Sequence, residues 1–145
     1  MNKWILAFTV VVLTSCKKDE VLPSVPEIEL ISVSPTVVQS FGEPVILRFK
    51  YQDGDGDLGE PDPDSYSLEV KDSRLNAADG YHVPPLAPLD SEVAIEGELE
   101  VELTPLFLLG NGAQETVTYS IRLRDRAGNW SNTLVSPAVM VVDSL

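Results

Sequence analysis

The sequence predicts an all-β protein, a single antiparallel β-sandwich of about seven strands that follows a cleaved signal peptide. Three observations support this prediction. Apolar and polar residues alternate in several short segments, and clusters of Gly, Pro, Asp and Asn separate these segments. No stretch of about a dozen residues has the 3.6-residue period of an amphipathic helix. The chain has 145 residues, which is enough for one domain.

The first residues have the parts of a secretory signal. Lys3 supplies a positive charge, and an apolar run over residues 4–13 follows it. A membrane-spanning helix needs roughly 20 apolar residues, so this run is too short to be one. The single Cys of the chain, Cys16, comes shortly after the run. We therefore expect residues 1–15 to be a signal peptide that is removed.

The residues around Cys16 indicate the kind of signal. The run Leu13-Thr14-Ser15-Cys16 resembles the lipobox of bacterial lipoproteins, in which cleavage precedes the Cys and its sulfur carries a diacylglyceryl group. The resemblance implies lipidation of Cys16, and acyl chains contribute about 0.8 kcal/mol per buried CH₂ to membrane anchoring. The alternative is a free Cys in an ordinary secreted protein. In either case one Cys cannot form a disulfide within the domain.

Charged residues follow the Cys. Lys17-Lys18-Asp19-Glu20 is similar to the export signal of Bacteroidetes-type surface lipoproteins, and this similarity implies a lipid-anchored protein of the outer membrane that faces the cell surface. A solvated polar tether is the alternative, since any linker must be polar. Two prolines, Pro23 and Pro26, favour an extended spacer. Residues 16–26 are therefore interpreted as lipidated Cys and tether.

The remaining residues, 27–145, form the predicted β domain. Its clearest alternation runs from Glu98 to Leu103, where three apolar residues alternate with three glutamates. Three prolines interrupt residues 76–90, which we expect to be largely irregular because proline cannot extend a central ladder. The pattern predicts strands over residues 27–33, 44–52, 65–71, 98–103, 116–124 and 133–142, with a poorly defined strand between the third and fourth.

Two segments carry a resemblance to a known fold. The passage from Leu103 to Asp125 resembles the E to F passage of fibronectin type III and related immunoglobulin-like domains, with Tyr119 in the place of the tyrosine corner. Residues 125–132 resemble a D-x-A-G-N-x-S turn that is frequent in bacterial immunoglobulin-like repeats. The resemblance implies that residues 53–64 and 125–132 emerge as neighbouring loops at one end of the sandwich.

The first of these loops begins with DGDGDLG, residues 53–59. Two carboxylates about 5 Å apart repel by roughly 3 kcal/mol at an effective dielectric of 20, so a cluster of them needs neutralisation. Ca²⁺ takes six to eight oxygen ligands, and Asp alternating with Gly lets a loop curl around one ion. The alternative is a solvated acidic turn in which the glycines provide positive φ. The sequence predicts a Ca²⁺ site formed by Asp53, Asp55, Asp57, Asp64, Asp125 and Asn129.

Charge and composition narrow the function. The chain has 10 Lys and Arg against 23 Asp and Glu, a net charge of −13, which excludes nucleic acid as a partner. His82 is the single His, and no serine lies in a G-x-S-x-G motif. We therefore expect a non-enzymatic protein that binds an envelope protein or gives structural support. The alternative is a carbohydrate-binding accessory of a glycan-uptake system, in which Trp130, Tyr81 and Tyr66 stack on sugars. The alternative for Trp130 is that its ring packs on the base of its own loop.

Overall fold

A computed structural model describes residues 22–144 of the chain. The expected signal peptide and Cys16 lie outside these residues. The described part is all-β and contains no helix, as the sequence predicts. Accordingly, nothing within residues 22–144 forms a helix long and apolar enough to cross a membrane.

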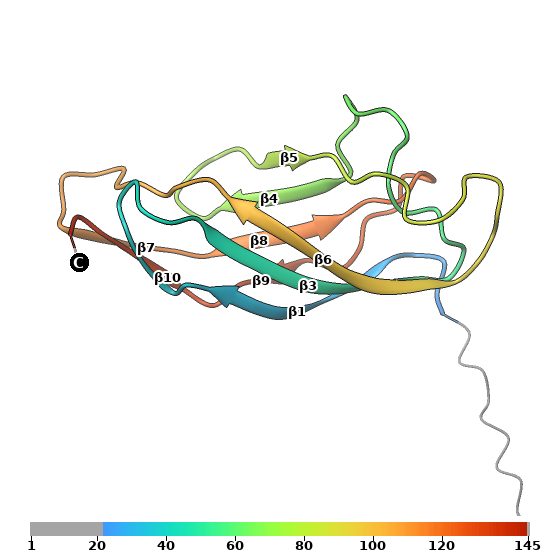
Figure 1. The fold of residues 1–145 in the computed structure, drawn as a ribbon, viewed down its shortest axis with the longest axis horizontal. Coiled ribbons are helices and arrows are strands. Elements are labelled where there is room, and N and C mark those ends of the chain that lie inside the picture. Colours follow the sequence, from blue (N-terminus) through green and yellow to red (C-terminus); the bar gives the residue numbers. More distant parts are fainter. Residues whose placement is uncertain (1–21, 145) are drawn as a thin grey trace, which may run out of the picture.

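Residues 22–144 form three open sheets (Figure 1). Their strand orders are β1-β3-β6, β2-β10-β7 and β5-β4-β8-β9. Neighbouring strands are antiparallel except for β2 and β10, which are parallel, so the expected purely antiparallel arrangement is wrong at this one pair. The strands are β1 (Glu27–Ser34), β2 (Val37–Gln39), β3 (Val45–Asp53), β4 (Leu68–Asp72), β5 (Asp79–Tyr81), β6 (Ile95–Leu103), β7 (Gln114–Val117), β8 (Tyr119–Leu123), β9 (Leu134–Val135) and β10 (Val139–Val142).

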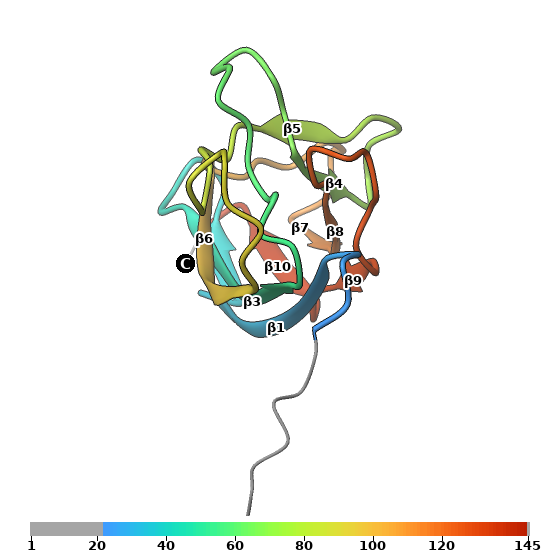
Figure 2. The same cartoon turned by 90° about the vertical axis from the view of Figure 1, so that its right-hand side faces the viewer.

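The sheets enclose one apolar core, and the arrangement is consistent with a β-sandwich. Viewed along the strands, β1, β3 and β6 lie opposite β4 and β8 (Figure 2). Alternation along β3 buries Val45, Leu47 and Phe49 completely, while Arg48 and Lys50 are exposed. The facing strand β8 buries Ile121 and Leu123 in the same way. Period-two patterning therefore gives each sheet one apolar face.

The predicted strands 27–33, 44–52, 65–71 and 98–103 correspond to β1, β3, β4 and β6. The single strand predicted over 116–124 is wrong, because the chain changes sheets at Thr118. Its N–H donates to Ser73 Oγ at 3.0 Å and its carbonyl accepts from Ser73 N–H at 2.9 Å. As a result β7 pairs with β10, whereas β8 pairs with β4 and β9.

The strand predicted over 133–142 is divided for a similar reason. Ser136 pairs with Tyr119, since the Ser136 N–H donates to the Tyr119 carbonyl and Ser136 Oγ accepts from the Tyr119 N–H, both at 2.8 Å. Pro137 follows and cannot donate to a ladder, so β9 ends and β10 begins in another sheet. The Tyr119 hydroxyl is buried and has no hydrogen-bond partner among residues 22–144, so the described structure lacks the hydrogen bond of a tyrosine corner.

One end of the molecule gathers four connections. The segment before β1 enters there, and the loops that follow β3 and β8 leave there (Figure 1). The loop leading into β6 lies at the same end (Figures 1 and 2). The chain ends near the opposite pole (Figure 1).

Candidate metal centre

The acidic loop begins inside the domain. Positions Val45, Leu47 and Phe49 point to the core, and the same alternation carries Asp53, the last residue of β3, to the inner side. Asp53 is completely buried. A buried carboxylate is costly unless it is paired or coordinates a metal. The strand that supplies the core thus also delivers one charged group into the interior.

Asp53, Asp55 and Asp57, called here the aspartate triplet, converge. Each offers one carboxylate oxygen that lies within 4.8 Å of the corresponding oxygens of the other two. The Oδ1 atom of each residue is buried and has no hydrogen-bond partner within residues 22–144. The Asp57 N–H donates to Asp53 Oδ2 at 3.0 Å, and the Ala127 N–H donates to Asp57 Oδ2 at 3.0 Å. The backbone therefore satisfies one oxygen of two carboxylates and leaves the other unpartnered.

The electrostatics of the triplet are unfavourable without a counterion. Burial, together with the charges of Asp55 and Asp57, raises the pKa of Asp53 to about 6. Burial and the neighbouring charges of Asp125 and Asp55 also raise the pKa of Asp57. Raised pKa values of this origin mean that the ionised forms are destabilised where they stand.

No basic side chain forms an ion pair with the triplet in the described part of the chain. Arg126 of the neighbouring turn is the cation whose charge acts on Asp57, but its Nη1 donates to the carbonyl oxygens of Leu58 and Gly59 at 3.3 and 3.0 Å. An all-oxygen donor set suits a hard cation, Ca²⁺ or Mg²⁺. The residues present thus fit the ion that the sequence predicts.

The loops at residues 53–64 and 125–132 are neighbours, which confirms that prediction. The Arg126 N–H donates to the Asp57 carbonyl at 3.1 Å, and Leu58 forms a β-bridge with Asp125. Asp125 is buried, and both of its oxygens accept hydrogen bonds from Asn129: one from the backbone N–H at 2.6 Å and one from the side-chain amide at 2.8 Å. This pair supports the turn beside the triplet.

The structure therefore divides the six predicted ligands. The aspartate triplet converges, Asp125 and Asn129 bind each other, and Asp64 lies in an exposed turn where its N–H donates to Asp62 at 3.0 Å. Asp64 is not part of the converging group, because the turn at residues 61–64 carries it out to the surface. Sequence spacing could not separate these roles, since all six residues lie in the two neighbouring loops.

Trp130, the predicted ligand-binding residue, is half-buried. The guanidinium carbon of Arg122 lies over its ring at 4.1 Å from the centroid, and that of Arg124 lies 5.4 Å away. These are cation–π contacts, so the ring is engaged with its own sheet. Tyr66 is 57% exposed and Tyr81 is half-buried. The structure thus gives Trp130 a packing role and leaves its binding role a prediction.

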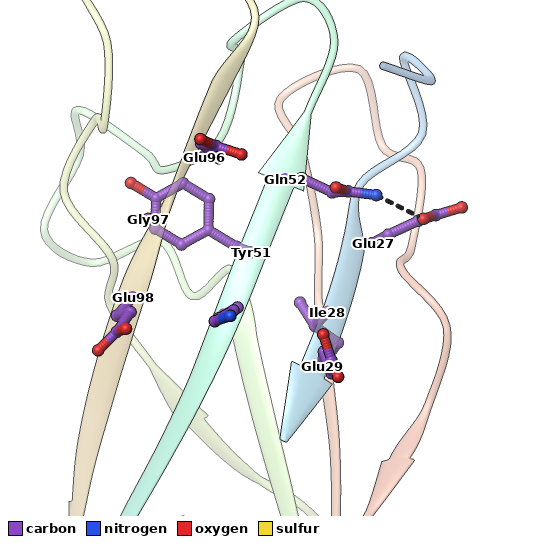
Figure 3. A pocket seen from close by; sticks show the side chains of 9 residues that line it. Glu27, Ile28, Glu29, Tyr51, Gln52, Glu96, Gly97 and Glu98 are labelled. Atoms are coloured by element: carbon purple, nitrogen blue, oxygen red, sulfur yellow. Dashed lines mark hydrogen bonds between the residues drawn. The ribbon is translucent and has the colours of Figure 1, made fainter. Parts of the chain in front are cut away.

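A surface pocket of about 410 Å³ lies across β1, β3 and β6 near the same end (Figure 3). The Tyr51 ring lies over Gly97, and Gln52 donates to Glu27 at 2.7 Å (Figure 3). Strand register places Lys50 between Glu29 and Glu98, so a cation and carboxylates alternate there. The side chains that line this pocket are mostly charged, and none of them belongs to the aspartate triplet.

The sequence does not predict two contacts that these loops make with the start of the domain. The Gly54 N–H donates to the carbonyl of Pro23 at 2.8 Å, and Asn132 bonds both backbone groups of Ile28. The alternation of Gly with Asp in the loop is the one signal that could have suggested close backbone approach.

Comparison with known proteins does not extend this description. The chain matches no family model, no curated protein and no solved structure.

Proposed function

We propose that this chain is a non-enzymatic, lipid-anchored protein of the cell envelope whose β domain binds Ca²⁺ through the aspartate triplet. The observation that carries the calcium proposal is the convergence of three carboxylates that each keep a buried oxygen without a partner in residues 22–144. A divalent cation would neutralise their repulsion and satisfy these oxygens at once. The role of the bound cation would be to rigidify the end of the domain that carries the loops at residues 53–64 and 125–132.

Calcium is favoured over magnesium by the nature of the donors. Mg²⁺ demands a near-ideal octahedron and retains several waters, whereas Ca²⁺ accepts irregular sets of carboxylate and carbonyl oxygens. The loop supplies three carboxylates within a five-residue span, and the carbonyl oxygens of Pro23 and Val93 lie against the glycines between them. Extracellular modules of this kind bind Ca²⁺ with a Kd on the order of 10⁻⁴ to 10⁻³ M.

The test is calorimetric titration and thermal unfolding with Ca²⁺ or Mg²⁺. The wild-type domain should bind Ca²⁺ and gain several degrees in Tm at millimolar Ca²⁺. Asp55→Asn should remove both effects, because it takes one charge from the triplet. Asp64→Asn is the matched control, since this residue lies in the same loop but outside the converging group. An unchanged wild-type Tm in Ca²⁺ would refute the site.

The anchor is proposed from the lipobox resemblance at Cys16. Mass spectrometry of the protein from its native membrane should find diacylglyceryl on Cys16, and Cys16→Ser should release the protein into the soluble fraction. Protease treatment of intact cells tests the cell-surface assignment, which predicts that the domain is digested while periplasmic controls survive.

The envelope-support function is preferred to the glycan-uptake accessory because Arg122 stacks on the Trp130 ring. A sugar would have to displace this cation–π contact to use that face. Affinity-gel electrophoresis with soluble polysaccharides tests the alternative. Retardation that is lost in Trp130→Ala would favour it over structural support.

A further inference from the structure

The metal loop holds the chain that leads to the membrane anchor. Residues 22–26, called here the tether segment, run alongside the loop. The Gly54 N–H donates to the Pro23 carbonyl at 2.8 Å, and Pro26 is buried. Immediately after the tether segment, the Asn132 side chain accepts from the Ile28 N–H at 2.8 Å and donates to the Ile28 carbonyl at 2.9 Å. The loops at residues 53–64 and 125–132 therefore both form hydrogen bonds with the chain where it enters the domain.

The contact at Gly54 leaves no room for a side chain. A Cβ atom at this position would overlap the carbonyl oxygen of Leu22 and would lie 2.7 Å from that of Pro23. Among the described glycines, those with positive φ are Gly56, Gly59 and Gly128, so Gly54 does not owe its identity to backbone conformation. The close approach of the tether segment is what requires glycine here.

The amide that binds the tether segment stands between two members of the triplet, Asp53 and Asp55. Without a cation, these two carboxylates repel each other, because their ligand oxygens lie within 4.8 Å. Asp53 is completely buried and Asp55 Oδ1 is also buried, which restricts side-chain rotation, so separating the two carboxylates favours movement of the peptide between them, which carries the Gly54 N–H. A bound ion would draw the carboxylates together and hold that N–H toward Pro23.

The second contact, between Asn132 and Ile28, is also connected to the loop that carries the triplet. Asp57 accepts from the Ala127 N–H through its side chain and from the Arg126 N–H through its carbonyl. That turn continues to Asn132, which holds Ile28. Displacement of the triplet would therefore reach the incoming chain along two routes.

We propose that cation binding at the aspartate triplet and docking of the tether segment are thermodynamically coupled, so that the ion fixes the domain on its anchor. This rests on the proposed function. Linkage makes the coupling reciprocal: if the ion strengthens docking, then docking strengthens ion binding by the same factor. Loss of the tether contact should thus weaken Ca²⁺ binding although every carboxylate is retained.

The experiment uses the mature chain with Cys16→Ser, which needs no detergent. Gly54→Ala should raise the Kd for Ca²⁺ by about fivefold or more, which is the lower end of typical coupling. Gly112→Ala is the control, because a Cβ there would meet no atom closer than 3.5 Å. Deleting residues 16–23 removes the Pro23 carbonyl without touching the loop and should raise the Kd similarly. In the unmutated loop, Ca²⁺ should slow hydrogen exchange of the Gly54 N–H at least tenfold over chelator.

The outcomes separate the two proposals. If this Cys16→Ser chain does not bind Ca²⁺, the proposed function fails. If it binds Ca²⁺ but the Kd is unchanged by both Gly54→Ala and the deletion, and exchange at Gly54 does not respond to Ca²⁺, the coupling is refuted while the metal site stands. A raised Kd in the deletion variant supports the coupling even where Gly54→Ala unfolds the loop.

Discussion

At the scale of single residues, Asp53 decides how the site responds to pH. Its pKa is about 6 in the metal-free folded protein and near the ordinary value of 3.8 when unfolded. Between these values the folded state binds more protons, so the free energy of unfolding falls as pH rises through the window. The contribution of Asp53 to the free energy of unfolding should therefore be greater at about pH 4 than at about pH 7. Urea unfolding in the presence of a chelator measures this difference. Asp57 adds a change of the same sign.

The control for this prediction is Asp53→Asn, which removes this titrating group and should reduce the dependence between about pH 4 and pH 6 to the smaller change contributed by Asp57. Ca²⁺ competes with protons for the same carboxylates, so its stabilising increment should grow as pH rises through this window. A Ca²⁺ increment that is equal at both ends of the window would contradict the assignment of Asp53 as a ligand.

Gly56 is a second residue with an individual role, and Gly128 is its natural control. Both have positive φ, at 73° and 93°. A Cβ on Gly56 would overlap the Val93 carbonyl, whereas nothing lies within 4 Å of one on Gly128. Gly128→Ala should cost about 1 kcal/mol of unfolding free energy from backbone strain alone, and Gly56→Ala should cost more. If chemical denaturation gives equal losses of unfolding free energy for the two variants, the loop that leads to β6 moves away from the new Cβ at no energetic cost.

At the scale of elements, alternation predicted the strands with a full apolar face and missed those that change sheets. The strands β1, β3, β4 and β6 were predicted because each shows apolar positions two residues apart. The break between β7 and β8 depends on the hydrogen bonds of Thr118 with Ser73, which is far away in sequence. The local pattern around Thr118 therefore does not predict this break. β5 lies where a poorly defined strand is expected between residues 71 and 98, whereas β2 is not predicted, and both have only three residues, too few to show a period.

Ser136 makes the second sheet change possible, which yields a prediction. It is buried, accepts from the Tyr119 N–H and donates to the Pro137 carbonyl at 2.8 Å. Ser136→Ala should lower the free energy of unfolding by about 1–3 kcal/mol, because it leaves a buried N–H unsatisfied. Ser91→Ala, which removes one exposed hydroxyl bond to Pro88, should change stability by less than about 0.5 kcal/mol. Denaturant midpoints at constant slope measure both, and similar costs would contradict the role of Ser136.

The site was predictable to the extent that chemistry lies in local spacing. Alternate carboxylates indicated the aspartate triplet, and the expected topology brought the turn at residues 125–132 beside it. The placement of Asp64 outside the converging group depends on the path of residues 61–64, and the docking of Pro23 depends on where the chain enters the domain. Both follow from the packing of segments far apart in sequence, which spacing does not encode.

At the scale of the whole molecule, one pole combines the acidic loop with the incoming chain. The full sequence carries a net charge of −13, so general repulsion opposes the compact state. The core offsets this with fully buried side chains such as Phe49 and Leu47, which belong to the same strand that ends in Asp53. Stability and the metal site are therefore linked through β3.

Salt and calcium should stabilise the molecule by different mechanisms. NaCl screens the repulsion between exposed carboxylates, since the Debye length is about 10 Å at 0.1 M, and should raise the Tm gradually. Ca²⁺ at the same ionic strength should raise the Tm further, because the buried oxygens of the triplet are poorly screened by bulk salt. Asp55→Asn should keep the NaCl increment and lose the extra Ca²⁺ increment in thermal scans. If NaCl and CaCl₂ of matched ionic strength give the same Tm, the cation acts on the net charge of the molecule and not on a site.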